Sequence, residues 1–311
     1  MAANALTPKR STIKQMRRDW QLYVMLLLPV LYLLIFKYGP MYGAQIAFRN
    51  FIATKGIWGS PWVGLKHFER FFNSHMFWRV IRNTFALSFY RLFAGFPIPI
   101  ILALSLNQVG NKFFKKSVQM VTYAPHFISV VVLIGIVMQI LDPRVGIVNL
   151  AIQAVGLEPI NFMGKSQYFR HIFVWSGIWQ NVGFSCIIYL AVLSTIDPAL
   201  HEAAVVDGAS RMQRIRHIDI PGIMPVAIVL LIMNMGRLLN IGFEKVLIMQ
   251  NPLNMSQSEI IQTYVYHVGM TSQIPQFSYA TAIGLFRSVV NLTMLVSVNR
   301  FARWIKGHSL W

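Results

Sequence analysis

Polar and charged side chains inside long apolar runs are the residues of this sequence whose chemistry is most informative. Asn234, Arg237 and Glu244 follow one another at steps of three and seven residues, which places them on one face of a helix, with Asn240 beside them. Charged groups inside an apolar span usually face a cavity or a partner. Amide and guanidinium donors suit sugar hydroxyl groups. We therefore expect this face to line a route for a hydroxyl-rich solute.

Side chains in the other apolar runs extend the predicted route. Trp175 and Trp179 are four residues apart and share a helix face, and their flat rings suit the C–H face of a pyranose. The whole predicted set is Asn83, Tyr90, Arg91, Trp175, Trp179, Asn234, Arg237, Asn240, Glu244, Arg287 and Asn291. A structural role is the alternative, in which Arg237 and Glu244 pair with one another or with a second subunit, and the tryptophans pack between helices.

Positive charge dominates these apolar runs. Glu244 is their one clear carboxylate, and the cations that outnumber it are Arg91, Arg237, Lys245 and Arg287. Lys245 lies near the end of its run and has a second interpretation, in which its ammonium group reaches the membrane surface. With all four cations beside the route, we hypothesise that the solute is acidic, for example an oligosaccharide of uronic acids.

Chemistry that makes or breaks covalent bonds is not indicated. Gly164-Lys165-Ser166 resembles the end of a phosphate-binding loop, but Pro159 stands where that pattern needs glycine. Cys186 is the only cysteine, which excludes an intrachain disulfide, and no histidines have metal-ligand spacing. We therefore expect no enzyme, no metal and no cofactor in this chain.

Composition places the chain in a membrane. Of its 311 residues 55% are hydrophobic and 12% are charged, about half the charge of a soluble domain. The net charge of +18 comes without an aromatic and basic module, so nucleic acid is not an expected partner. A membrane span needs around 20 apolar residues. Six segments qualify, at about 22–38, 80–106, 118–141, 171–193, 222–250 and 277–301.

The distribution of charge predicts the orientation. Half of the 28 basic residues fall in four short segments that six spans place on one side, although the first outer loop also contains Arg49, Lys55, Lys66 and Arg70. The four segments carry Lys9, Arg10, Lys14, Arg17 and Arg18; Lys112, Lys115 and Lys116; Arg211, Arg214 and Arg216; and Arg300, Arg303 and Lys306. The positive-inside rule then predicts a multi-pass protein of the cell membrane with both termini in the cytosol.

One membrane domain is expected, at residues 21–304. A basic cytosolic tail at 1–20 precedes it, and a short cytosolic tail at 305–311 follows. Residues 39–79 form a long outer loop rich in Phe, Trp and Gly, which suggests a packed cap, although Trp58 and Trp62 also suit interfacial anchoring.

A cytosolic loop at 194–221 predicts a helix, a turn and a second helix. Asp197 suits the N-cap of the first helix, and Pro198 suits its first position. Gly208 suits the turn because glycine adopts positive φ freely. Pro221 is expected to end the second helix before the next span. Such a pair of helices is able to dock a partner from the aqueous side.

The spacing of this loop resembles the EAA loop of ABC-transporter permeases. Glu202-Ala203-Ala204 is followed by Gly208 and then by Ile218 and Pro221, with Ile220 in place of the usual leucine. Further segments resemble the sugar-permease branch, closest to permeases for oligosaccharides released from polysaccharides. They are Tyr38-Gly39-Pro40-Met41-Tyr42-Gly43, Ala47-Phe48, Trp62-Val63-Gly64-Leu65, Gly242-Phe243-Glu244-Lys245 and Asn251-Pro252-Leu253.

This resemblance implies an all-α, six-helix membrane domain of a type I ABC importer, with the helix pair as its cytosolic coupling element. It implies four kinds of partner: a second homologous permease, two ATPase subunits that bind ATP and Mg²⁺, an extracytoplasmic solute-binding protein and an oligosaccharide substrate. The residues carried over as the ATPase-coupling set are Glu202, Ala203, Ala204, Asp207 and Gly208. The alternative is a self-sufficient secondary carrier or channel.

Overall fold

The computed structural model describes residues 18–306, and within this range every regular element is a helix, with two isolated β-bridges. Five helical segments here are long and apolar enough to cross a membrane, and a bent helix pair counts as a sixth. The all-α, six-span prediction is therefore confirmed. The predicted basic tail at 1–20 lies largely outside the described range, as does the C-terminal tail at 305–311.

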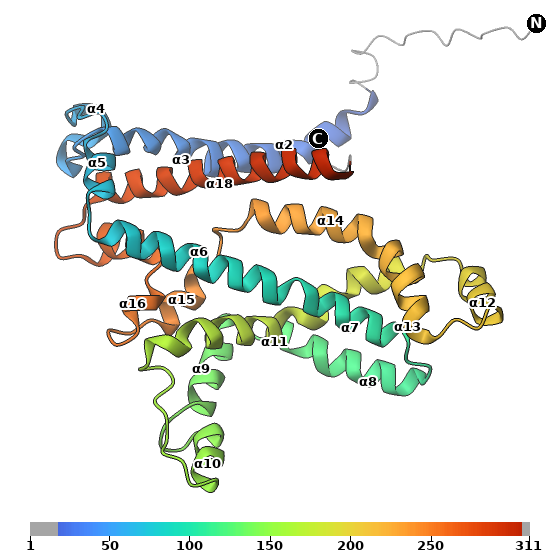
Figure 1. Cartoon of the computed structure of the whole chain (residues 1–311). Coiled ribbons are helices and arrows are strands. Elements are labelled where there is room, and N and C mark those ends of the chain that lie inside the picture. Colours follow the sequence, from blue (N-terminus) through green and yellow to red (C-terminus); the bar gives the residue numbers. More distant parts are fainter. Residues whose placement is uncertain (1–17, 307–311) are drawn as a thin grey trace, which may run out of the picture.

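The long helices run along a common direction (Figure 1). The five spans are Trp20–Phe48, Met76–Asn107, Ser166–Leu193, Arg211–Gly236 and Phe277–Arg300. Their main elements are α2 (Trp20–Leu33), α6 (Met76–Gly95), α7 (Pro97–Asn107), α11 (Ser166–Leu193), α14 (Ile220–Gly236) and α18 (Phe277–Lys306). Buried apolar side chains from α6, α9 (Val130–Ile140), α11 and α15 (Phe243–Met249) form one cluster, which includes Leu133 and Ile241.

Two helices continue past a proline where we expected them to have ended. The prolines are Pro40 and Pro221. The first span continues through α3 (Gly39–Met41) and a 3-10 segment to Phe48, past the predicted end at residue 38. Likewise, α13 (Arg211–Arg214) continues into α14, so Pro221 does not end it. A π turn precedes each proline: the N–H of Gly39 donates to Leu34, and the N–H of Ile220 donates to Ile215, each five residues back. The proline that follows has no N–H to satisfy, so the helix continues.

The third span, predicted at 118–141, is sharply bent. It consists of α8 (Lys112–Tyr123), a 3-10 turn at Ala124–Phe127 and α9, and the two parts are bent by 106°. Pro125 lies in the 3-10 turn, and the hydroxyl of Ser129 accepts a hydrogen bond from the Val132 N–H to begin α9. The bend follows because the backbone leaves helical geometry between these two residues.

The fifth span is also broken, where the sequence predicted one helix over 222–250. α14 ends at Gly236 and α15 begins at Phe243. Gly242, just before α15, has φ of 102°, a conformation that only glycine adopts readily. The irregular segment between them, residues 237–242, buries Leu238, Leu239 and Ile241.

The segment that follows the first span, which we predicted to be an outer loop and here name the outer cap, has contacts within itself. It contains α4 (Gly56–Gly59) and α5 (Lys66–Phe72). The guanidinium group of Arg49 donates to the carbonyl oxygen of Ser60 over 2.9 Å and lies over the rings of Trp58 and Trp62, 5.6 and 5.5 Å from their centroids. This outer cap lies at the opposite end of the molecule from α12 (Pro198–Val206) and α13 (Figure 1).

Candidate functional site

The irregular segment 237–242 is where charged side chains from different helices meet. Arg91 on α6 donates a hydrogen bond of 2.8 Å to the carbonyl oxygen of Ile241. Arg287 on α18 donates to the side-chain oxygen of Asn240. A broken helix leaves backbone groups without helical partners, and groups of this kind at membrane depth line a cavity or bind neighbouring side chains. Adjacent residues of this segment thus bind cations from two different spans.

Lys245, three residues beyond the break, is buried in α15. The residue is 8% exposed, and its ammonium group donates to the carbonyl oxygen of Phe173 over 2.9 Å and lies 4.8 Å from the centre of the Phe173 ring. The interpretation in which this lysine reaches the membrane surface is therefore wrong. No carboxylate pairs with Lys245, Arg91 or Arg287 among the ion pairs of the described residues.

The expected helical face of Asn234, Arg237 and Glu244 does not form, because α14 ends at Gly236. All three side chains are exposed. Arg237 and Glu244 do not pair with one another, so that part of the structural alternative is wrong for this conformation, and their pairing with a second subunit stays a prediction. Of the residues predicted with them, Asn240 binds Arg287 as described above, and the buried side-chain oxygen of Asn291 has no hydrogen-bond partner within the described part of the chain.

Aromatic side chains of α6 and α11 form a second part of the site. The indole N–H of Trp175 donates to the hydroxyl oxygen of Tyr90 over 3.0 Å. The Nδ1 atom of His171 lies 2.9 Å from the same oxygen. Trp175 is 53% exposed and Trp179 is 47% exposed, so their faces are open in this chain. We did not predict His171, although its position four residues before Trp175 on the same helix face was the signal that could have identified it.

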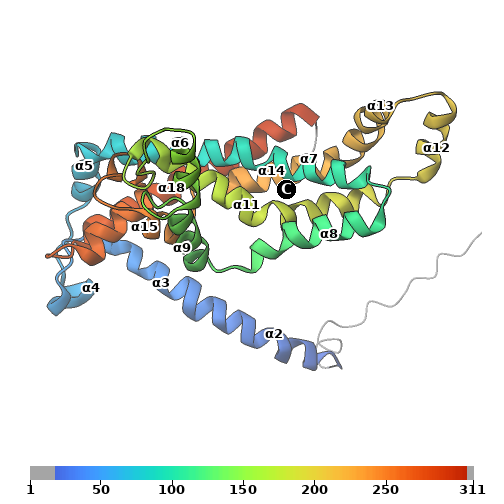
Figure 2. The ribbon, with the colours of Figure 1, turned by 90° about the horizontal axis from the view of Figure 1, so that it is seen from below.

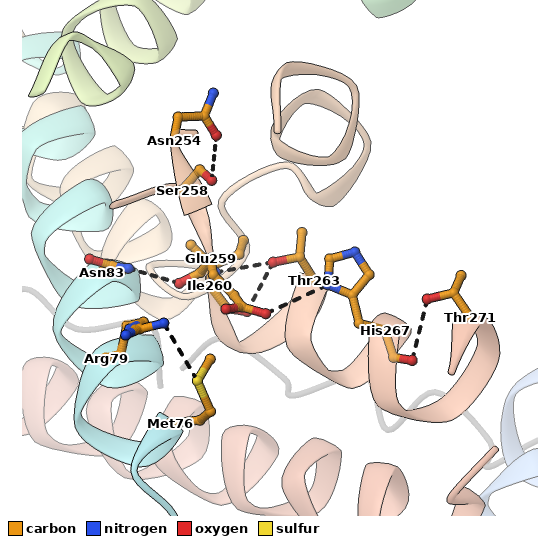
Figure 3. A network of polar contacts seen from close by, with 10 residues as sticks. All are labelled: Met76, Arg79, Asn83, Asn254, Ser258, Glu259, Ile260, Thr263, His267 and Thr271. Carbon is orange, nitrogen blue, oxygen red and sulfur yellow. Dashed lines mark hydrogen bonds and ion pairs between the residues drawn. The ribbon is translucent and has the colours of Figure 1, made fainter. Parts of the chain in front are cut away.

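Asn83, also predicted for the route, is buried and contacts the chain itself. Its amide nitrogen donates to the carbonyl oxygens of Ser256 and Glu259, each over 3.0 Å, and its oxygen accepts from Arg170 over 2.9 Å. Figure 3 shows Asn83 against the segment that contains Glu259 and α17 (Ile261–Tyr266). In this conformation Asn83 holds the segment around Ser256 and Glu259 to α6 rather than facing an open space.

The predicted helix pair is present at one end of the molecule. The side chain of Asp197 accepts from the Ala199 N–H over 2.9 Å and caps α12, as expected. Gly208 has φ of 75°, which makes the turn after α12. α13 then begins with a capping box between Ser210 and Gln213. These local predictions are confirmed.

The predicted coupling residues lie on the accessible side of this pair. Glu202, Ala203, Asp207 and Gly208 are exposed, and Ala204 is half-buried. A shallow hollow lies between α12 and the helix that begins with α13, lined by Ala204, Ala209, Gln213, Arg214, His217 and Ile218. Figure 2 shows α12 and α13 projecting beyond the long helices. The arrangement suits the docking of another protein.

Within the described part of the chain, no group of three or more His, Cys, Asp or Glu side chains is placed to hold a metal ion. Cys186 is buried and free. The polar groups described above bind, orient and dock, and they do not form an arrangement of acid, base and nucleophile.

Comparison with known proteins identifies what this arrangement resembles. The family described as binding-protein-dependent transport system inner membrane component matches residues 95–307. Protein LplB of Bacillus subtilis (strain 168) is 41% identical, covering 94% of this chain and 92% of that protein. The polygalacturonan/rhamnogalacturonan transport system permease protein YteP of the same organism is 42% identical, and the match covers 95% of this chain and 91% of that protein.

Two solved structures are similar along nearly the whole chain. One is a bacterial ABC transporter involved in the import of the acidic polysaccharide alginate, with a TM-score of 0.88, 40% identity and coverage of 96% of this chain and 100% of that chain. The other is the bacterial alginate ABC transporter in complex with an alginate pentasaccharide-bound periplasmic protein, with a TM-score of 0.88, 39% identity and coverage of 97% and 100%.

Proposed function

Because this chain belongs to the family of binding-protein-dependent transport system inner membrane components, and is thus a transport subunit and not an enzyme, we propose that it carries acidic oligosaccharides across the membrane. It acts as one permease subunit of an ATP-driven importer. The oligosaccharides derive from polysaccharides rich in uronic acids. Both termini and the α12–α13 pair face the cytosol.

One observation carries the substrate proposal: cations from three elements meet around the broken fifth span without a carboxylate partner. Arg91 and Arg287 bind residues 241 and 240, and Lys245 follows in α15. Buried charge is costly unless it is paired. A carboxylate-bearing solute supplies the missing negative charge, and amide groups such as Asn240 suit its hydroxyls. The proposal agrees with the alginate and polygalacturonan named for similar proteins.

The aromatic pair completes this account of binding. Trp175 and Tyr90 are joined by a hydrogen bond, which fixes the open face of Trp175. A fixed indole stacks on the apolar face of a sugar ring at a small entropic cost. In the assembled importer a second permease covers this side and completes the pathway.

Transport proceeds by alternating access. ATP and Mg²⁺ bind to two cytosolic ATPase subunits, which receive α12 of each permease. An extracytoplasmic binding protein delivers the oligosaccharide, in line with the complex described for the similar alginate transporter. ATP binding draws the ATPases together, the α12–α13 pair moves with them, and the site opens outward.

Two measurements test this proposal. The tagged chain is extracted mildly from its native membrane, and the co-purifying proteins are identified by mass spectrometry. Recovery of a second permease and an ATPase is expected; a stable homo-oligomer alone, reproduced after crosslinking, favours the carrier or channel. The recovered importer is then placed in liposomes and offered an oligogalacturonate and its neutral reduced counterpart. Preferred uptake of the uronate is expected, and equal uptake overturns the acidic-substrate proposal.

A further inference from the structure

A buried carboxylate joins the helix pair to the membrane helices. Asp219, at the end of the π turn between α13 and α14, is 0% exposed. Its Oδ1 atom lies 3.3 Å from Nε2 of His201. Its Oδ2 atom accepts a hydrogen bond of 2.9 Å from the side-chain nitrogen of Gln108. Each oxygen of one carboxylate therefore contacts a different part of the chain.

These three residues come from three elements that are distant in the sequence. His201 lies in α12, one residue before Glu202 of the predicted coupling set. Gln108 is the C-cap of α7. Asp219 is the last residue of the π turn that leads into α14. The carboxylate thus links the projecting helix to the ends of two membrane helices.

α12 has little else to hold it to the membrane helices. None of its residues is buried, and both views show it standing away from the long helices (Figures 1 and 2). Among the described residues, the His201–Asp219 contact is the polar side-chain contact that joins α12 to them. Exposed ion pairs contribute little to stability, but separating a buried carboxylate from its partners is costly. α12 is therefore unable to move away from α14 without exposing or unpairing Asp219.

We propose that Asp219 is a positioning residue that transmits the displacement of α12 to α14 and α7. This inference rests on the proposed coupling of α12 to an ATPase. A partner that pulls on α12 moves His201, and the shared carboxylate moves the start of α14 and the end of α7 together. α14 leads directly to the broken segment at 237–242, so the movement reaches the site where Arg91 and Arg287 are bound.

The test measures transport against ATP hydrolysis in the complete importer, purified through the tagged chain and placed in liposomes. His201→Ala removes one partner, and Asp219→Asn keeps the side-chain volume but removes the charge. We expect the amount of oligogalacturonate imported per ATP hydrolysed to fall about tenfold in each variant, which corresponds to about 1.4 kcal/mol. The yield of co-purified ATPase and its hydrolysis rate stay unchanged.

The double variant and a matched control identify the contact itself. If both residues act through one contact, His201→Ala with Asp219→Asn is no worse than the more severe single variant. Asp197→Asn removes a carboxylate from the same helix but preserves the cap, because asparagine caps helices as well as aspartate does. It is expected to leave import per ATP unchanged.

Three results overturn the inference. They are unchanged import per ATP in both single variants, losses that add in the double variant, and import that falls only in proportion to lost ATPase. Failure of the proposed function is distinguishable from these, because it appears already in the unmutated chain as the absence of any co-purified ATPase.

Discussion

The guanidinium group of Arg91 binds the backbone of Ile241, a residue 150 positions away in the chain, over 2.8 Å. The contact holds α6 to the segment where the fifth span is broken. A carbonyl group in such a break has lost its helical partner, and the bilayer core offers no water to replace it. Arg91 therefore stabilises the broken segment, in addition to its proposed position beside the solute.

Substitution of Arg91 by Gln is expected to destabilise the chain. The shorter side chain leaves the Ile241 carbonyl without its donor, at a cost of about 1–3 kcal/mol. The measurement is the thermal unfolding midpoint of the purified protein in detergent. Arg79→Gln is the control, because Arg79 is exposed on the same helix and contacts only the sulfur of Met76 by a hydrogen bond of 3.8 Å. Equal midpoints for the two variants would contradict the role given to Arg91.

Replacement of Lys245 by Met should separate stability from transport. Burying an ammonium group that has no carboxylate partner costs free energy. The free energy of unfolding of the apolar variant is therefore expected to be higher by about 1–3 kcal/mol, and the variant should unfold at a higher temperature. Uptake of oligogalacturonate is expected to fall, because positive charge beside the route is lost. Lys165→Met, at an exposed lysine just before α11, should change neither quantity. Simultaneous loss of stability and uptake would indicate that Lys245 only holds the fold.

Arg287 is expected to contribute to the choice between acidic and neutral solutes. Arg287→Gln keeps a hydrogen-bond donor near Asn240 but removes the charge. We expect the uptake of oligogalacturonate to fall about tenfold, while that of the neutral reduced oligosaccharide changes much less. Arg300→Gln, at an exposed arginine on the same helix α18, is the control. A parallel fall for both sugars would assign Arg287 to helix packing.

The turn after α12 is expected to tolerate no side chain. Gly208 has φ of 75°, where residues other than glycine are strained by roughly 1–2 kcal/mol. Gly208→Asp should leave membrane insertion intact but abolish transport, because the docking surface is distorted. Co-purification of the ATPase and uptake are the two measurements. Gly110→Asp serves as the control, since Gly110 has ordinary φ and open space around it. Normal uptake with Gly208→Asp would count against the coupling role.

Acidic conditions are expected to loosen the outer cap. Burial lowers the pKa of the His67 imidazole below its usual value of 6.5, the nearby charges of Arg70 and Lys66 lower it further, and a hydrogen bond to the Arg49 carbonyl partly opposes them. The folded cap then binds fewer protons than the unfolded cap at mildly acidic pH. The cap therefore has its full stability at pH values above the pKa of His67 in the unfolded chain, and this stability falls as pH decreases below about 6.5.

Limited proteolysis from the outer side between about pH 7.5 and 5 measures this effect. Cleavage within residues 49–64 should increase toward low pH in the unmutated protein. The increase should disappear in His67→Gln, whose amide still donates toward the Arg49 carbonyl. His75→Gln, at an exposed histidine beyond α5, should behave as the unmutated chain. A pH response that survives in His67→Gln would contradict the assignment.

The spans were predictable because their apolar composition is a local property of the sequence. The same holds for the helix pair, where Asp197 and Gly208 act through their own backbone. The interruptions were not predictable in this way. Pro221 was expected to end a helix, but a π turn precedes it and the helix continues. Gly242 is compatible with a straight membrane helix, so its break depends on distant contacts such as that from Arg91.

The site was predicted in its residue types more successfully than in its geometry. Tyr90 and Trp175 were both expected beside the route, and the structure brings them into contact. We predicted that Asn234, Arg237 and Glu244 share one helix face, which requires a regular helix through all three residues. The helix ends at Gly236, so this face does not form. Asn83 could not be placed from the sequence, because the carbonyl groups that it binds are more than 170 residues away.

The π turns at Leu34–Tyr38 and Ile215–Asp219 also fix the rotational phase of the helices that contain them. A π turn holds one residue more than an α-helical turn, and each added residue rotates the following helix by about 100°. In the second case, the face that α14 presents to α18 is therefore set by a single inserted residue beside Asp219. Deletion of one residue from this turn would leave the length and hydrophobicity of the span nearly unchanged but turn Ile223 and Ala227, now buried, toward a different neighbour.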